Sequence, residues 1–312
     1  MPFERENVKA VIAALAGQGV LIGTSSWKYL GWRNQLYDES RYVWRGRFAE
    51  ARFERLCLAE YAQVFKTVCV DAAYYKFPDE RWLQDLASQT PPDFQFALKV
   101  TGQITIKHFS NLPRFGLLAG KPNKNFLNAE LFESAFLAPC KAVQPGIGLL
   151  IFEFSHFGPG DFQRGREFVE ALDGFLARLP RGWRYGVEIR NRNFLQPEYF
   201  ATLARHGAAH IYNSWQDMPP LDEQMALPGS RTNPDLCGSR LLLRPGRRYE
   251  EAVKLFSPYE RIKDPYPEGR AAGVKLIRDA IGRAGTGKTF IYVNNRFEGN
   301  ALETIAGIIG AV

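Results

Sequence analysis

The stretch Tyr185-Gly-Val-Glu-Ile-Arg-Asn-Arg-Asn-Phe194 is a short apolar strand that runs directly into two charged residues, Glu188 and Arg190. Charged side chains at the end of a buried strand are typical of a functional site in barrel enzymes. Other apolar runs end in the same way: the run from Val20 leads into Thr24, Ser25 and Trp27, Lys99 closes Phe94 to Leu98, Glu153 closes Leu149 to Phe152, and Asn294 and Asn295 follow Phe290 to Val293. The pattern indicates where a site lies without naming its reaction.

Strand-like apolar runs alternate with helical patterns along most of the chain. Many of these runs are continuously apolar, which is typical of parallel strands that are covered on their outer side. Strands are predicted at 20–25, 67–71, 95–100, 147–153, 185–189, 208–213, 239–244 and 290–294, and helices at 48–65, 78–89, 129–142, 161–179, 197–206, 267–284 and 299–310. Eight such units predict an α/β fold, a single (β/α)8 barrel of the TIM type.

The 312 residues and their 46% hydrophobic content suit one large domain, so we expect residues 1–312 to form a single barrel domain. An amphipathic lead-in helix is predicted at 6–16. Two long connections, 101–128 after the third strand and 214–238 after the sixth, leave the carboxyl ends of strands. Loops of that length are usually functional, so both are expected to border the site.

The first residues carry acids where a signal peptide needs basic and then apolar residues, and no apolar run reaches membrane-spanning length. We therefore expect a cytoplasmic protein with no membrane partner. The four cysteines, Cys57, Cys69, Cys140 and Cys237, show no CxxC spacing, which predicts free thiols. The sequence sets no oligomeric state.

The net charge of +7 permits anionic ligands or nucleic acid without requiring either. Residues 27–55 interleave aromatic residues with seven Lys and Arg residues, a composition that can stack bases and neutralise phosphates. The interpretation we favour is a loop whose aromatic side chains cover the barrel mouth and whose arginines pair with the acids Asp38, Glu39, Glu50 and Glu54. Nucleic-acid binding through this segment is kept as the alternative.

The segment 282–289 matches the phosphate-loop pattern GxxxxGK[ST], but its context does not fit. A phosphate loop follows a strand and opens a helix, whereas this segment follows a predicted helix and leads into the strand at 290–294. We therefore expect no nucleotide there. Divalent metal binding through Glu153 and Glu188 is conceivable but not favoured, because basic residues are mixed with the acids at the strand ends.

Glu188 and Arg190 are two residues apart, so both are expected to face the barrel interior or its mouth. A buried structural salt bridge is one interpretation. A site role is favoured, because desolvation makes a buried pair a poor stabiliser. In such a site Glu188 would act as general base, Lys99 as acid or electrostatic stabiliser and Arg190 as anion clamp, with Thr24, Ser25, Asn294 and Asn295 orienting hydroxyl groups.

Five ordered motifs within residues 20–306 resemble the YecE-like family, also called domain of unknown function 72. They are Ile22-Gly-Thr-Ser-Ser-Trp27 with Gly31-Trp32, Tyr74-Tyr75-Lys-Phe-Pro78, Phe94-Gln-Phe-Ala-Leu-Lys99, Val187-Glu-Ile-Arg190, and Asn294-Asn295 with Gly299. The resemblance implies a TIM-type barrel that has been related to sugar isomerases, with no established reaction. Trp27, Tyr74 and Tyr75 are expected near the barrel mouth.

The chain departs from the pattern of that family at several strand ends. Cys69 stands where members usually carry Glu, Asp71 replaces an Asn, Glu153 a Gln and Asn213 an Asp. Asn191 and Phe194 replace a His and a Trp, and Arg244 lies near the usual seventh-strand Arg. The resemblance therefore implies a divergent subgroup with its own substrate or activity.

These observations predict a barrel that binds or transforms a small polar, anionic or sugar-like molecule at its carboxyl face, with isomerase-like proton transfer as the reaction. The expected substrate-binding residues are Thr24, Ser25, Trp27, Asp71, Tyr75, Glu153, Asn213, Arg244, Asn294 and Asn295. A nucleic-acid-binding protein that uses the 27–55 segment and a non-catalytic binding scaffold are the alternatives.

Overall fold

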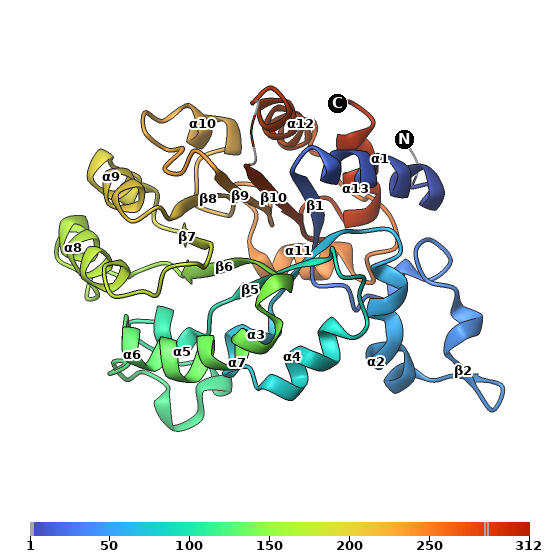
Figure 1. The fold of residues 1–312 in the computed structure, drawn as a ribbon, viewed down its shortest axis with the longest axis horizontal. Coiled ribbons are helices and arrows are strands. Elements are labelled where there is room, and N and C mark those ends of the chain that lie inside the picture. The colour runs from blue at the N-terminus through green and yellow to red at the C-terminus, as the bar shows by residue number, and fades with distance from the viewer. Residues whose placement is uncertain (1–2, 284, 286) are drawn as a thin grey trace.

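Eight parallel strands close into a barrel in the computed structural model, which describes residues 3–283, 285 and 287–312 (Figure 1). The closed order around the barrel is β1, β10, β9, β8, β7, β6, β5 and β4. The strands are β1 (Val20–Ser25), β4 (Thr67–Val70), β5 (Gln95–Lys99), β6 (Ile147–Phe154), β7 (Tyr185–Ile189), β8 (Ala209–Ser214), β9 (Leu236–Leu241) and β10 (Lys288–Val293). The predicted (β/α)8 barrel is confirmed.

Helices connect successive strands and surround the barrel (Figure 1). The lead-in helix predicted at 6–16 is present as α1 (Arg5–Gly17), which buries Val8, Ile12 and Leu15. The others are α2 (Glu50–Tyr61), α3 (Ala72–Tyr75), α4 (Glu80–Ala87), α5 (Gly102–Thr105), α6 (Ala129–Leu131), α7 (Ala138–Cys140), α8 (Gly165–Leu176), α9 (Pro197–Arg205), α10 (Leu221–Ala226), α11 (Tyr249–Phe256), α12 (Pro267–Ile281) and α13 (Ala301–Ile309).

Alternate residues of each strand face the barrel interior, where glycines make room for larger side chains. Ile211 of β8 is the register partner of Gly238 of β9, and its side chain also reaches Gly186 of β7, whose register partner is Ala209. A Cβ atom at Gly186 or Gly238 would lie 2.5 or 2.3 Å from the Ile211 Cδ1 atom, so neither position accepts a side chain without displacing Ile211. This packing fixes the interior of β7 to β9 beneath the charged strand ends.

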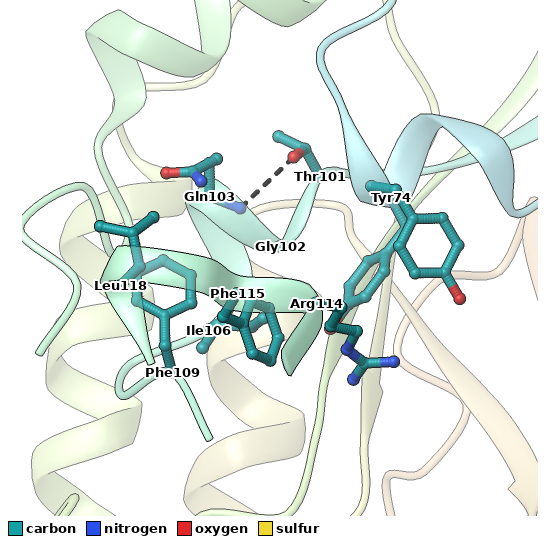
Figure 2. A pocket seen from close by; sticks show the side chains of 10 residues that line it. Tyr74, Thr101, Gly102, Gln103, Ile106, Phe109, Arg114, Phe115 and Leu118 are labelled. Atoms are coloured by element: carbon teal, nitrogen blue, oxygen red, sulfur yellow. Dashed lines mark hydrogen bonds between the residues drawn. The ribbon is translucent and has the colours of Figure 1, made fainter. Parts of the chain in front are cut away.

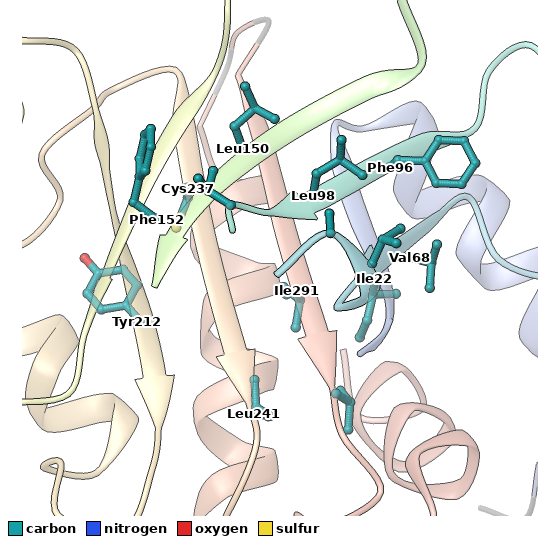
Figure 3. Close-up of a cluster of buried hydrophobic side chains, with 14 of the residues drawn as sticks. Ile22, Val68, Phe96, Leu98, Leu150, Phe152, Tyr212, Cys237, Leu241 and Ile291 are labelled. Carbon is teal, nitrogen blue, oxygen red and sulfur yellow. The ribbon is translucent and has the colours of Figure 1, made fainter. Parts of the chain in front are cut away.

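The outward-facing residues of the strands pack against the surrounding helices and form the main core. Ile22, Val68, Leu98 and Phe152 are fully buried members of this layer (Figure 3). Because both faces of each strand are buried, the strand sequences are apolar at successive positions. That is the pattern from which the barrel was predicted.

Three elements differ from the prediction. The seventh strand spans 236–241 and not 239–244, because Leu242 and Leu243 leave the barrel and pack against Ala252 and Phe256. The helix predicted at 129–142 is a π-helical turn between the short helices α6 and α7. α11 lies in a region where no helix was predicted.

Both long connections contain short helices. The 101–128 loop holds α5 and a 3-10 segment, η3 (Pro113–Leu118). The second connection holds α10 and ends where β9 begins at Leu236. All four cysteines are free and buried. No helix in the described part of the chain is long and apolar enough to cross a membrane.

Candidate functional site

Six charged residues meet at the carboxyl ends of five barrel strands. We call them the charge cluster. Asp71 follows β4, Lys99 ends β5, Glu153 lies in β6, Glu188 lies in β7, Arg190 follows β7, and Arg240 lies in β9. Three positive and three negative side chains therefore lie together at the carboxyl face, where barrels of this type place their active sites.

Glu153 lies at the centre of the charge cluster. Its Oε2 atom contacts the Lys99 ammonium, the Arg190 Nη2 atom at 2.9 Å and the Arg240 Nη1 atom at 3.2 Å. The side chain is 2% exposed, so the contacts are shielded from solvent. One carboxylate oxygen thus holds three cations that would otherwise repel one another in a low-dielectric environment.

Glu188 is a fully buried member of the charge cluster. Its Oε2 atom accepts a hydrogen bond from Arg240 Nη1 at 2.7 Å, and its Oε1 atom accepts one from Arg190 Nε at 3.1 Å. Glu153 and Glu188 are direct partners in the parallel register of β6 and β7. The two carboxylates therefore hold Arg190 and Arg240 between them.

Asp71 is the most accessible acid of the cluster. Its Oδ1 atom lies 3.2 Å from Arg240 Nη2, and its side chain is 30% exposed. Cys69, two residues before Asp71, faces the barrel interior and is buried. Burial raises the pKa of the Cys69 thiol to about 12, so the thiol is neutral and the acidic function at this strand end belongs to Asp71.

The cluster keeps Glu153, Lys99 and Arg240 charged. Burial by itself would raise the pKa of Glu153, but Arg190, Lys99 and Arg240 outweigh it and hold that pKa far below its ordinary value. Burial would lower the pKa of Lys99, but Glu153 and Asp71 hold it above its ordinary value. The pKa of Arg240 is likewise raised, because the nearby carboxylates, Glu188 foremost among them, outweigh its burial.

Aromatic rings cover two of the cations. The Arg190 guanidinium carbon lies 3.7 Å from the centre of the Trp215 ring, and the Lys99 Nζ atom lies 3.8 Å from the centre of the Tyr74 ring. Contacts of this geometry are attractive, because the ring face carries negative charge. Each of these two cations is therefore held between a carboxylate and an aromatic ring.

A cavity of about 440 Å³ opens above the charge cluster. Arg114 and Arg296 also line it, and neither forms an ion pair within 4 Å among the residues the structure describes. The Nε atoms of Arg240 and Arg296 are buried, with no hydrogen-bond partner among the described residues. The lining comprises Asp71, Tyr74, Tyr75, Lys99, Leu112, Arg114, Glu153, Ser155, Arg190, Trp215, Arg240, Leu242, Tyr249, Glu250 and Arg296.

The structure brings part of the predicted site together. Lys99, Glu188 and Arg190, predicted as catalytic, are members of the charge cluster, although Glu188 lies below the cavity and not on its surface. The predicted substrate-binding residues that line the cavity are Asp71, Tyr75 and Glu153.

The other predicted site residues lie outside the cavity lining. They are Thr24, Ser25, Trp27, Asn213, Arg244, Asn294 and Asn295. Thr24 faces α2, where its hydroxyl donates to the backbone oxygen of Ser26 and contacts the Tyr61 hydroxyl. Arg244 follows β9 and contacts Asp264 at 3.5 Å, so it does not reach the strand-end cluster.

The two asparagines after β10 make structural hydrogen bonds. Asn294 Oδ1 accepts from the Arg296 backbone N–H at 3.0 Å. Asn295 Oδ1 accepts from Trp32 Nε1 at 3.2 Å and from the Ala301 backbone N–H at 2.8 Å. Asn213 Nδ2 donates to the Ile189 backbone oxygen at 3.0 Å. These amides hold backbone segments in place around the barrel mouth.

Trp27 and Ser25 are buried beside the site and do not open onto the cavity. Tyr74 and Tyr75 do line it, as expected for residues near the mouth. Neither the Trp27 indole N–H nor the Ser25 hydroxyl has a hydrogen-bond partner among the described residues.

Sequence analysis missed Arg240, Trp215, Arg114 and Arg296. Arg240 lies inside the predicted strand 239–244, but the observed strand ends three residues earlier, at Leu241, so Arg244 at the predicted end was chosen instead. A signal was available, since Arg240 is the one charged residue in the segment from Leu236 to Leu243. Trp215 directly follows β8, so it obeys the same strand-end rule as the residues that were found.

The 27–55 segment packs partly against α2 and partly at the barrel mouth, where Trp32 Nε1 donates to Asn295 Oδ1 after β10. Tyr37 and Tyr42 contact Phe53 of this helix edge to face, with ring centres 5.1 Å apart in each pair, so these rings do not cover the barrel mouth. Arg33 pairs with Glu39 at 3.1 Å, as predicted, whereas Arg41 pairs with Glu60, which was not among the expected partners. The hairpin of β2 (Val43–Trp44) and β3 (Arg47–Phe48) projects from this segment.

The segment 282–289 follows α12 and runs into β10, in the helix-to-strand context predicted for it, and its residues 284 and 286 lie outside the described residues. Among the residues that are described, no three His, Cys, Asp or Glu side chains are grouped as metal ligands. The acids of the charge cluster are instead paired with Lys and Arg.

The fold and the strand-end site define a (β/α)8 barrel with a charged cavity at its carboxyl face. The model of the family described as protein of unknown function DUF72 matches residues 21–312, and the chain belongs to this family. The resemblance drawn from the sequence motifs is thereby confirmed.

Solved structures of the family share the fold. Two crystal structures of a DUF72 family protein from Enterococcus faecalis V583 superpose with a TM-score of 0.62 at 16% identity, covering 94% of this chain and 96% of theirs. A DUF72 family protein from Thermotoga maritima superposes with a TM-score of 0.56 at 18% identity, covering 93% of this chain and 96% of that one. No curated protein matches the chain at a significant level.

Proposed function

We propose that the barrel binds a small anionic, hydroxyl-bearing organic molecule in the cavity above the charge cluster. The observation that carries the proposal is the pair Arg114 and Arg296, which line the cavity without a carboxylate partner among the described residues. An Arg side chain that faces a cavity unpaired is suited to bidentate binding of a phosphate or carboxylate.

The charge balance of the cavity supports the same conclusion. Its lining holds five cationic and three acidic side chains, an excess of two positive charges, and the buried Glu188 below reduces the excess to one. A concave site with a positive excess and low-dielectric walls concentrates anions. The partly exposed Asp71 carboxylate and the Tyr75 hydroxyl are placed to hydrogen-bond hydroxyl groups of the bound molecule.

Proton transfer by Glu188 and Lys99 is not part of this proposal. Both Glu188 oxygens are already bonded to Arg190 and Arg240, and the carboxylate lies below the cavity. The raised pKa of Lys99 keeps its ammonium charged. A general base must lie within reach of the substrate proton, and Glu188 does not line the cavity.

The proposal is tested by titrating the protein with ribose 5-phosphate, inorganic phosphate and ribose while the fluorescence of Trp215 is followed. Trp215 lines the cavity and stacks on Arg190, so occupancy should change its emission, and a Trp215→Phe variant identifies its share of the signal. We expect saturable binding of ribose 5-phosphate and phosphate and none of ribose.

The arginine variants then locate the site. Replacing Arg114 or Arg296 by Gln should weaken ribose 5-phosphate binding about tenfold to hundredfold, since a hydrogen bond to a charged group contributes about 1.5–3 kcal/mol. Arg166→Gln on the exposed face of α8 is the matched control and should leave binding unchanged. Equal binding by all three variants and the wild type would contradict the proposal.

A further inference from the structure

A second cavity of about 360 Å³ lies beside the charged one and shares a wall with it. Tyr74, Tyr75 and Arg114 line both cavities. Figure 2 shows Arg114 and Tyr74 at one end of the second cavity and Phe109 and Leu118 at the other. The two cavities therefore adjoin along a single row of side chains.

The second cavity has a different character from the first. Apart from the shared Arg114, it has no charged residue in its lining, and Ile106, Phe109, Phe115 and Leu118 supply apolar surface. Its polar side chains are Tyr74, Tyr75, Thr101 and Gln103, and the Thr101 hydroxyl already accepts a hydrogen bond from the Gln103 backbone N–H (Figure 2). Such a surface favours an apolar group over water.

We infer that the ligand is bipartite: an anionic head occupies the charged cavity and an apolar tail of the same molecule occupies the second cavity. This inference rests on the proposed function. The shared wall argues for one occupant, because a molecule whose anion contacts Arg114 has its remaining atoms within reach of Phe115. The Arg114 guanidinium carbon lies 4.9 Å from the centre of the Phe115 ring.

The substrate class that follows is a phosphate or carboxylate joined to a short alkyl or aryl group. A sugar phosphate without an apolar substituent would fill only the charged cavity. The tail would cover apolar side chains of the 101–128 loop, a loop that leaves the carboxyl end of β5 and includes η3. Selectivity by tail length then resides in this loop, as is common for loops at this face of a barrel.

The test is a titration with n-alkyl phosphates from methyl to hexyl, with inorganic phosphate as the head group alone, followed by Trp215 fluorescence. Burying one methylene group stabilises a complex by about 0.8 kcal/mol, so affinity should rise about fourfold for each added methylene until the second cavity is full.

Two leucines of η3 provide a matched pair of variants. Leu118 lines the second cavity and is 42% exposed, whereas Leu117 is 90% exposed and does not line it. Leu118→Asn should weaken the chain-length dependence and leave phosphate affinity within about twofold of wild type. Leu117→Asn should leave both unchanged, and Arg296→Gln should weaken every member of the series by the same factor.

The outcomes separate the two claims. If all alkyl phosphates bind as tightly as inorganic phosphate, the bipartite ligand is wrong and the proposed anion site stands. A chain-length dependence that persists unchanged in Leu118→Asn would place the tail elsewhere and would also overturn the inference. If neither phosphate nor any alkyl phosphate binds saturably, the proposed function itself fails.

Discussion

Replacing Glu153 by Gln should destabilise the fold through the three cations that this carboxylate holds. The variant keeps the shape of the side chain and leaves three positive charges against two negative ones in the charge cluster. Lys99 loses its ion-pair partner, whereas Arg190 and Arg240 keep Glu188. Removing one member of a buried pair costs about 3–5 kcal/mol, because the remaining charge stays buried.

Urea unfolding at pH 7 measures this cost directly. At about 2 °C per kcal/mol for a chain of this size, we also expect the melting temperature to fall by about 6–10 °C. Adding Lys99→Met to Glu153→Gln removes the unpaired cation and restores equal numbers of charges. The double variant should therefore be more stable than Glu153→Gln alone, a positive coupling in a double-mutant cycle.

Glu170→Gln is the control. Glu170 forms an exposed pair with Arg166 on α8, and such a pair contributes less than about 1 kcal/mol. The reasoning is refuted if Glu153→Gln costs no more than this control. It is also refuted if Lys99→Met worsens the stability of Glu153→Gln, since Lys99 would then be stabilised by something other than the shared carboxylate.

Three further predictions follow from the same geometry. Glu188→Gln should lower the free energy of unfolding by about 3–5 kcal/mol in the same urea assay, because Glu188 is fully buried. Asp71→Asn should lower it by less than about 1 kcal/mol, because Asp71 is partly exposed, and equal losses for the two variants would contradict this argument. Burial lowers the pKa of His210 from 6.5 to about 3, so the unfolded chain takes up its proton first, and stability should fall by about 1.4 kcal/mol per pH unit as the pH is lowered from 6.5 to about 5, above the range in which carboxylates titrate; His210→Asn should remove this slope, and an unchanged slope would show that other groups cause it. Charge reversal at Arg45 and Arg47, in the hairpin that exposes 60% of Trp44, should leave ribose 5-phosphate binding unchanged; loss of a salt-dependent affinity for DNA or RNA in these variants would instead support the nucleic-acid alternative.

The barrel was predictable because its strands are apolar on both faces. Such runs are visible without knowing which side chain points inward, and the order of strands and helices follows from them. Lys99, Glu153, Glu188 and Arg190 were found because each interrupts or closes such a run. Parallel strands in a barrel bring their carboxyl ends to one rim, so residues chosen by this rule lie together.

The same uniformity hides which residues face inward. In β1, the residues before Thr24 are apolar on both faces of the strand. The sequence therefore gives no sign that Thr24 points outward to Tyr61. Register depends on this parity, and a shift of one residue exchanges the two faces. For β9 the error had another source. Gly238 and Ser239 are poor strand formers, so the start of the strand was not recognised, although the packing of Ile211 requires a glycine at 238.

Residues in loops were the hardest to find. Arg114 lies in the irregular 101–128 loop, where no periodicity ties a side chain to the barrel rim. Asn294 and Asn295 were predicted to orient hydroxyl groups, but their side chains bind backbone and indole groups nearby. An amide that binds a ligand and one that holds a loop have the same signature in a sequence.

The charge cluster also constrains how this protein can change through evolution. Because Glu153 holds three cations, a substitution at a buried member of the cluster leaves an uncompensated buried charge that a second substitution must remove. Viable lineages should therefore replace these residues in pairs, an acid lost at one strand end being gained at a neighbouring one. Among homologous sequences, the positions of Cys69, Glu153, Glu188 and Arg240 are then expected to covary more strongly with one another than with the apolar residues that surround them.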